Sequence, residues 1–159
     1  MTRRESRQVA IGLLFERSFD YERTADEIMN DAAEEREEVI SDFAKELFLR
    51  ADENLGDINE KIQRCADNWR IDRIDRVTLS ILRLAGCEID FFPEIPVEIT
   101  VNEALELARY FGEEESVGFI NGVLGKYALG VEKPNAKPRP LSAETEEAEE
   151  VSTDTAVEE

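Results

Sequence analysis

Apolar residues recur at steps of three and four along the first 130 residues, which is the spacing of an amphipathic helix. The clearest stripe is Ile58, Ile62, Cys65 and Trp69. No segment keeps the period of two that is typical of a half-buried strand. We therefore predict an all-α fold of about seven helices. They are expected at residues 3–19, 25–34, 36–53, 58–69, 73–91, 101–110 and 116–128.

Polar residues and glycines at the ends of these segments predict where helices start and stop. Thr24 is placed to cap the second helix with its hydroxyl. Gly56 is expected to end the third helix, and Asp57 to cap the fourth. Residues 100–103 (TVNE) have the capping-box pattern and are expected to open the sixth helix. Gly112 stands where that helix would end in a left-handed residue.

Some side chains within the stripes have a structural and a functional interpretation. Trp69 and the thiols of Cys65 and Cys87 lie on or beside apolar stripes, so we expect them in the core. Arg83 and Glu88 are charged positions between apolar neighbours on one helix. A partly buried ion pair or cap contact and a partner-binding charge both fit these two residues, and the sequence leaves the choice open.

The composition changes after residue 132. Residues 133–140 contain three prolines. Residues 141–159 contain eight acidic residues and no Lys or Arg. Such a segment buries too little apolar surface to offset its ordering entropy. We expect a folded domain at 1–132 and a disordered linker and acidic tail at 133–159. The tail either competes with nucleic acid for basic residues or only keeps the chain in solution.

The composition excludes several classes of enzyme. The chain has no histidine and two cysteines, so it holds no Ser-His-Asp triad, no HExxH zinc site and no four-cysteine zinc site. We expect no catalytic residue, no metal and no other cofactor. The apolar run at 9–15 is too short for a signal peptide, and no run is long enough to span a membrane. A cytoplasmic protein is the expectation.

The charge is unevenly distributed along the chain. The net charge is −19, yet the first 17 residues carry four arginines and two glutamates. Arg3, Arg4 and Arg7 would lie within about 100° of arc on a helix, where they could hold a phosphate near the helix start. They could equally form a solvated chain terminus. The overall acidity argues against nucleic-acid binding by the whole surface but not by a local patch.

Several segments together resemble the family of transcription antitermination factors called NusB. They are residues 2–10 (TRRESRQVA), 76–88 (RVTLSILRLAGCE), 96–109 (PVEITVNEALELAR), 111–112 (FG) and 119–126 (FINGVLGK). The resemblance covers residues 2–130 and implies two perpendicular helical bundles and a role without catalysis. It also implies binding of boxA-type RNA together with NusE, a small-subunit ribosomal protein, within the RNA polymerase antitermination complex that supports transcription of ribosomal RNA operons.

The resemblance also implies candidate RNA-binding residues. Arg3, Arg4 and Arg7 match the basic start of the family, and Glu115 matches an acidic position near its RNA-facing side. Phe15 stands where the family usually has a tyrosine, so a hydroxyl contact is absent here. Two other functions remain as alternatives: a helical scaffold that binds only proteins, and an RNA-targeting module like that of the rRNA cytosine methyltransferases. A homodimer is also left open.

Overall fold

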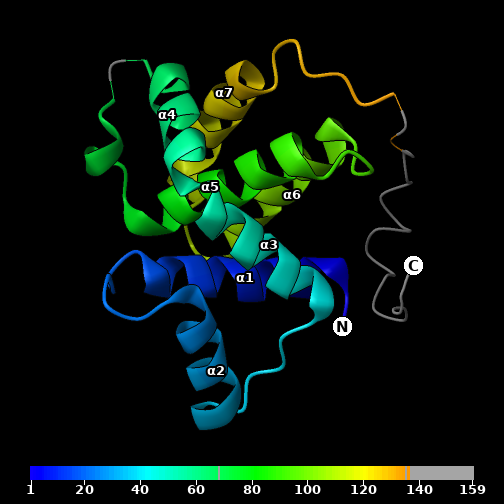
Figure 1. The fold of residues 1–159 in the computed structure, drawn as a ribbon. Coiled ribbons are helices and arrows are strands. Elements are labelled where there is room, and N and C mark those ends of the chain that lie inside the picture. The colour runs from blue at the N-terminus through cyan, green and yellow to red at the C-terminus, as the bar shows by residue number, and fades with distance from the viewer. Residues whose placement is uncertain (68, 135, 137–159) are drawn as a thin grey trace. The chain divides into compact units, whose positions relative to one another are not determined.

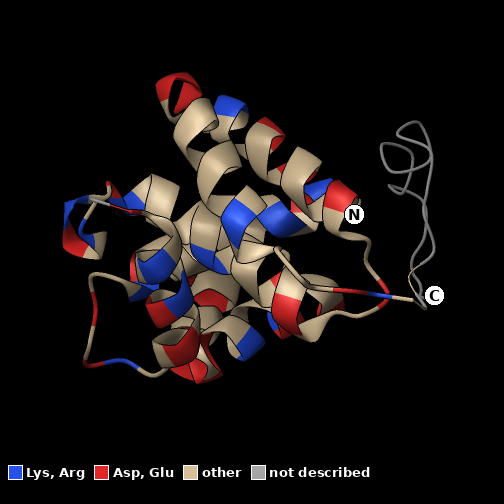
Figure 2. Cartoon of the chain, turned by 90° about the horizontal axis from the view of Figure 1, so that it is seen from above, with Lys and Arg blue, Asp and Glu red and all other residues tan. Residues whose placement is uncertain are grey.

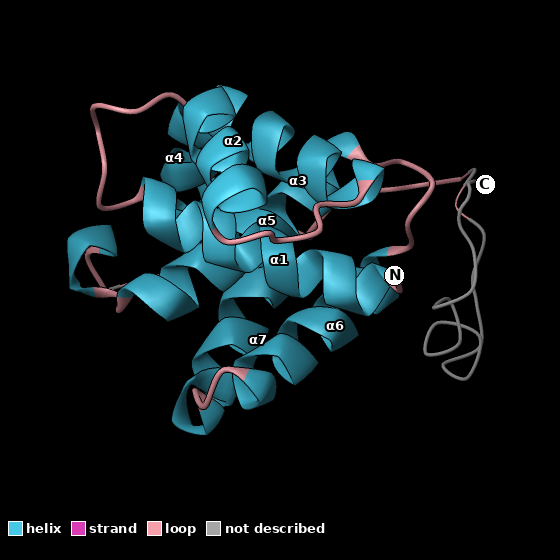
Figure 3. Ribbon diagram, turned by 90° about the horizontal axis from the view of Figure 1, so that it is seen from below, coloured by secondary structure: helices cyan, strands magenta, loops and turns pink. Residues whose placement is uncertain are grey.

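The computed structural model describes residues 1–67, 69–134 and 136 and confirms the all-α prediction. The described residues form seven α-helices, two short 3-10 turns and no strand (Figures 1 and 3). The helices are α1 (Arg3–Arg17), α2 (Ala25–Glu35), α3 (Asp42–Glu53), α4 (Leu55–Cys65), α5 (Arg76–Phe91), α6 (Val97–Tyr110) and α7 (Val117–Tyr127). The turns are η1 (Ile71–Arg73) and η2 (Glu114–Ser116). The tail at 141–159 lies outside the described residues, as does most of the predicted linker.

Two predicted helix ends are confirmed and three others are wrong. Thr24 caps α2, and its hydroxyl accepts a hydrogen bond from the Glu27 N–H at 3.1 Å. Gly112 has a φ of 80° just after α6. The predicted helix at 36–53 begins only at 42, because Glu37 turns to a φ of 55° and ends α2. Gly56 does not end a helix and Asp57 does not cap one, since α4 begins at Leu55 and includes both residues.

The predicted capping box at 100–103 is also wrong, because α6 begins at Val97, directly after Pro96. Thr100 is therefore inside the helix and 1% exposed, and its hydroxyl donates to the Glu88 carboxylate at 2.7 Å. Glu88 has no exposed surface, so of the two earlier interpretations the structure supports the buried contact. Similarly, α5 begins three residues later than predicted, because the carboxylate of Asp75 caps it.

The chain divides into two compact units, each of packed helices. The first unit, described at 1–49, contains α1, α2 and the start of α3. Its core is made by α1 (Ala10, Ile11, Leu13, Leu14), α2 (Ile28, Met29, Ala32) and α3 (Ala44, Leu47, Phe48). The perpendicular arrangement of two bundles stays a prediction.

The second unit comprises α4 to α7, and α5 is its central helix. From Thr78 to Ile89 every residue of α5 except Arg83 is buried, because α4, α6 and α7 all pack against it. The Tyr127 hydroxyl of α7 donates to Asp90 at 2.7 Å, and Lys61 of α4 pairs with the same carboxylate at 2.8 Å. Burial and this hydrogen bond raise the pKa of Tyr127 well above its ordinary value.

Lys133, the first residue of the predicted linker, contacts this unit. Its ammonium group donates to the backbone carbonyls of Glu88, Phe92 and Ile95, at 3.0, 3.0 and 2.7 Å. The first two carbonyls belong to the C-terminal end of α5, where a cation is favoured by the helix dipole. Ordered contacts of the chain therefore extend to residue 133. Across the described residues, every helix is too short or too polar to cross a membrane.

Candidate nucleic-acid interface

The first turn of α1 is closed by its own side chains. The Thr2 hydroxyl accepts from the Glu5 N–H at 2.9 Å, and the Glu5 carboxylate accepts from the Thr2 N–H at 3.0 Å. A capping box of this kind already occupies N–H groups that an anion would otherwise use. A phosphate at this end would therefore be held by arginine side chains rather than by the helix terminus itself.

Two of the three predicted arginines share one aromatic ring. The guanidinium of Arg3 lies 4.3 Å from the centroid of Phe43, and that of Arg7 lies 5.5 Å from it. Phe43 belongs to α3, which begins after Ser41. The hydroxyls of Ser6 and Ser41 lie 2.6 Å apart, and Ser41 also accepts from the Ala44 N–H. The start of α3 is thus tied to α1, and Phe43 is positioned against the arginines.

Burial separates the three arginines into two groups. Arg3 and Arg4 are partly exposed, whereas Arg7 is 1% exposed and is among the largest fully buried side chains of the protein. A buried guanidinium offers no surface to a ligand in this conformation. Arg7 is therefore a buried neighbour of Phe43, while Arg3 and Arg4 keep surface that RNA could reach. Phe43 was not predicted, because only the tertiary structure brings it to α1.

The other end of α1 carries an aromatic pair. The rings of Phe15 and Phe19 are edge to face, with centroids 5.0 Å apart. Phe15 is partly exposed and Phe19 is 58% exposed. Sequence reasoning selected Phe15 through the family resemblance and passed over Phe19, since the helix was expected to run through it.

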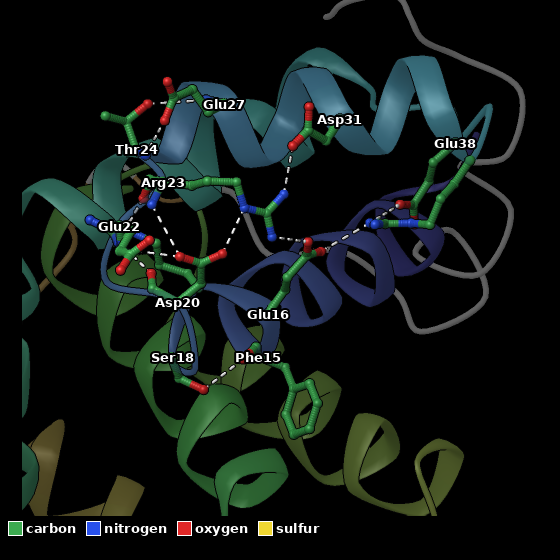
Figure 4. A network of polar contacts seen from close by, with 12 residues as sticks. Phe15, Glu16, Ser18, Asp20, Glu22, Arg23, Thr24, Glu27, Asp31 and Glu38 are labelled. Carbon is green, nitrogen blue, oxygen red and sulfur yellow. Dashed lines mark hydrogen bonds and ion pairs between the residues drawn. The ribbon is translucent and has the colours of Figure 1, made fainter.

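An ion-pair network supports the loop between α1 and α2 (Figure 4). Arg23 lies at its centre and pairs with Asp20 at 2.7 Å, with Asp31 at 2.6 Å and with Glu16 at 2.8 Å. Glu16 also accepts from Arg36, at 3.0 Å. Arg17 crosses the loop from α1 and donates to the carbonyls of Asp20 and Arg23, at 2.9 and 3.0 Å. These contacts join α1, the loop and α2.

The Arg23 guanidinium, followed by the N–H groups of Arg23 and Glu22, lowers the pKa of Asp20 from 3.8 to about 2. Because the unfolded chain takes up this proton first, the stability that Asp20 contributes is complete above pH 4. It is lost as the pH falls from about 4 to 2. We predict that Arg23→Ala raises the pKa of Asp20 toward 3.8, measured by a carboxyl-carbon NMR titration. Arg70→Ala, which removes a different surface ion pair, is the control and should leave this pKa unchanged.

Glu115, the fifth predicted residue, belongs to the second unit. It lies in η2 between α6 and α7 and is exposed. Next to it, burial and the charge of Asp75 raise the pKa of the Glu113 carboxyl. The four residues of α1 thus belong to one unit and Glu115 to the other.

Trp69 corrects another expectation. It was predicted to lie in the core, but it is 56% exposed and follows the end of α4. Its ring meets Phe119 of α7 edge to face, with centroids 5.9 Å apart. Lys126 of the same helix pairs with Asp67 beside it. The apolar stripe that predicted its burial runs to Trp69, but α4 already ends at Cys65.

Charges of both signs are interspersed along the described helices, so the basic start of α1 is a local feature (Figure 2). The described residues hold no group of three or more Cys, Asp or Glu side chains that could bind a metal ion. The described residues thus form an all-helical protein with cationic and aromatic side chains gathered on α1. The chain belongs to the NusB family: the model described as "NusB family" matches residues 4–129.

Relatives with curated names agree with the family. A transcription antitermination protein NusB from Natranaerobius thermophilus is 37% identical over 137 residues, covering 84% of this chain and 99% of the relative. The protein of the same name from Clostridium botulinum strain Hall is 40% identical over 141 residues, covering 79% and 99%. These relatives are named as transcription antitermination proteins and not as enzymes.

Solved structures share the fold. T. maritima NusB is 31% identical and superposes with a TM-score of 0.73, covering 85% of this chain and 96% of that one. A structure of antitermination factors NusB and NusE in complex with dsRNA has a TM-score of 0.70 at 23% identity, and covers 80% and 96%. At that identity the second comparison shows the fold alone.

Proposed function

We propose that this protein is a transcription antitermination factor that acts in the cytoplasm and binds boxA-type RNA together with a NusE-type ribosomal protein. In this role it joins the RNA polymerase antitermination complex and supports transcription of ribosomal RNA operons. It performs no catalysis and needs no cofactor. Its RNA contacts begin at Arg3 and Arg4 on α1 and include Phe15, and Glu115 of the second unit is a further candidate RNA-binding residue.

The observation that carries the proposal is the arrangement at the start of α1. The guanidinium of Arg3 lies 4.3 Å from the centroid of the Phe43 ring, and that of the buried Arg7 lies 5.5 Å from the same centroid. An arginine ordered in this way loses less conformational entropy when it meets a phosphate. The exposed Glu5 carboxylate accepts from the Thr2 N–H in the capping box, which offsets only part of its charge near an incoming phosphate.

The charge of the protein supports a partner. A chain with a net charge of −19 repels RNA at long range, and two arginines neutralise few phosphates. A basic protein bound beside the RNA would supply the remaining neutralisation and would be attracted to the acidic surface. The solved complex of relatives that contains NusB, NusE and dsRNA is consistent with this pairing.

The test is fluorescence anisotropy of a labelled boxA-type RNA, titrated with the protein in the presence and absence of a NusE-type partner. We expect tighter binding with the partner. The double variant Arg3→Ala/Arg4→Ala should weaken binding about tenfold and reduce the slope of log affinity against log salt by about 1.4, since each of the two contacts to a single strand contributes about 0.7. Arg70→Ala, which removes an exposed arginine of the second unit, is the matched control.

Each result has a defined meaning. Equal binding by the wild type and the double variant would remove the start of α1 from the RNA site. Binding of the partner without any RNA affinity would favour the protein-binding scaffold. RNA affinity that the partner does not enhance would favour a stand-alone RNA-targeting module.

A further inference from the structure

Phe19 presents a large aromatic surface directly after α1. Its side chain is 58% exposed, whereas Phe48, Phe92 and Tyr127 are buried. Phe15, one turn earlier, supports it edge to face at 5.0 Å. Exposed aromatic rings are the surfaces on which single-strand binding proteins stack unpaired bases.

The loop that carries Phe19 is held in place on both sides. The Ser18 hydroxyl donates to the Phe15 carbonyl at 2.6 Å, as Figure 4 shows. On the other side, Arg17 donates to the carbonyls of Asp20 and Arg23. The Phe19 ring is thus presented by an ordered loop, and binding a ligand there costs little conformational entropy.

A partly exposed face of α1 connects this ring to the basic start. Arg4, Gln8 and Phe15 fall within about 40° of arc on the helix. Gly12, also exposed, lies between them along the chain, and a Cβ built there meets no atom within 4 Å. Glycine inside a helix costs about 1 kcal/mol relative to alanine, and here no packing contact requires it. A smooth helix surface at this point lets a strand pass close to the backbone.

We propose that Phe19, supported by Phe15, stacks one unpaired base of the same RNA strand whose phosphates meet Arg3 and Arg4. The proposal rests on the RNA-binding function proposed above and extends its site along α1, over about 22 Å at 1.5 Å per residue. The strand would run from the arginines across Gln8 and Gly12 to the aromatic pair.

The surrounding charges favour a base over a phosphate at this end. Glu16 lies three residues before Phe19 and Asp20 directly after it, and both are carboxylates. They would repel a phosphate, whereas a neutral base stacks on an aromatic ring without regard to sequence or charge. Arg23 already pairs with both of these carboxylates, which lowers their field near the ring.

The test places the fluorescent base 2-aminopurine in turn at each position of the boxA-type RNA, in the presence of the partner protein. Stacking quenches its emission, and we expect quenching at one position with the wild type. Phe19→Leu, which keeps an apolar side chain without a π face, should abolish this quenching and weaken binding about fivefold or more. Phe19→Tyr should preserve both, and all three proteins should share one salt slope.

Trp69→Ala is the matched control, because Trp69 is similarly exposed and also has an edge-on aromatic neighbour. It should bind RNA like the wild type. Full affinity and quenching in Phe19→Leu would overturn the stacking proposal and leave RNA binding at the arginines intact. An equal loss in Trp69→Ala would overturn it as well. RNA binding absent even from the wild type would overturn both proposals, and capture of the partner that depends on Phe19 would then assign the ring to a protein contact.

Discussion

Arg7→Ala is expected to lower the free energy of unfolding by about 3 kcal/mol, the largest effect that we predict for any single arginine. Arg7 is 1% exposed, and its guanidinium lies against the ring of Phe43. Truncating a fully buried long side chain removes its packing along the whole stem and leaves a cavity, which costs about 2–5 kcal/mol in protein cores. Removing the buried guanidinium also leaves the groups that bind it without their partner.

Urea unfolding followed by circular dichroism measures this effect. Arg4→Ala is the control, because Arg4 lies on the same helix but keeps exposed surface, and we expect it to change stability by about 1 kcal/mol or less. Equal stability of the two variants would contradict the structural role of Arg7. In a variant that lacks all three arginines, loss of RNA binding could come from unfolding as well as from lost contacts. The binding test therefore changes only Arg3 and Arg4.

Gly86→Ala is expected to destabilise the protein by about 2 kcal/mol, although alanine is the better helix former. A Cβ at position 86 would lie 2.8 Å from the hydroxyl oxygen of Tyr127 and 2.9 Å from the ring carbon that bears it. The ring cannot withdraw at low cost, because its hydroxyl is bound to Asp90 and Lys61 lies over its face at 4.2 Å. Overpacking of this kind costs about 1–3 kcal/mol, more than the helix propensity of alanine returns.

Gly122→Ala provides the matched control in α7, because a Cβ there meets nothing within 4 Å. We expect it to stabilise the protein by up to about 1 kcal/mol, so thermal or urea unfolding should show changes of opposite sign. In a Tyr127→Leu background Gly86→Ala should lose most of its effect, since the opposing ring is gone. A Gly86→Ala protein as stable as the wild type would show that α5 and α7 can separate without penalty.

Helix positions were predictable from local signals, and helix ends only in part. The apolar spacing predicted each of the seven α-helices, because burial of one face imposes that period on any sequence. Thr24 was recognised as a cap since its hydroxyl bonds within its own turn. Thr100 has the same local pattern, but the buried Glu88 claims its hydroxyl. As a cap the hydroxyl would accept from an N–H of its own turn, whereas inside α6 it donates to a carboxylate of another helix.

The candidate site was predictable as a set of residue types and not as a geometry. The basic start was found from charge and from the family resemblance, yet only the structure separates the buried Arg7 from the more exposed Arg3 and Arg4. Phe43 and Phe19 carried no local signal that distinguished them from core aromatic residues. For Trp69 the local signal was misleading, because the apolar stripe does not indicate that α4 ends before this residue.

The sequence by itself therefore determined the all-α class, the order of the helices, the family and the basic start of α1, since all of these depend on residues close together in the chain. The tertiary structure alone decided which charged and aromatic side chains are buried and which remain exposed. Burial is a property of packing between segments distant in sequence, such as Arg7 against Phe43 and Thr100 against Glu88. Local periodicity says which face of a helix turns inward, but only the neighbouring helices determine how far that face is covered.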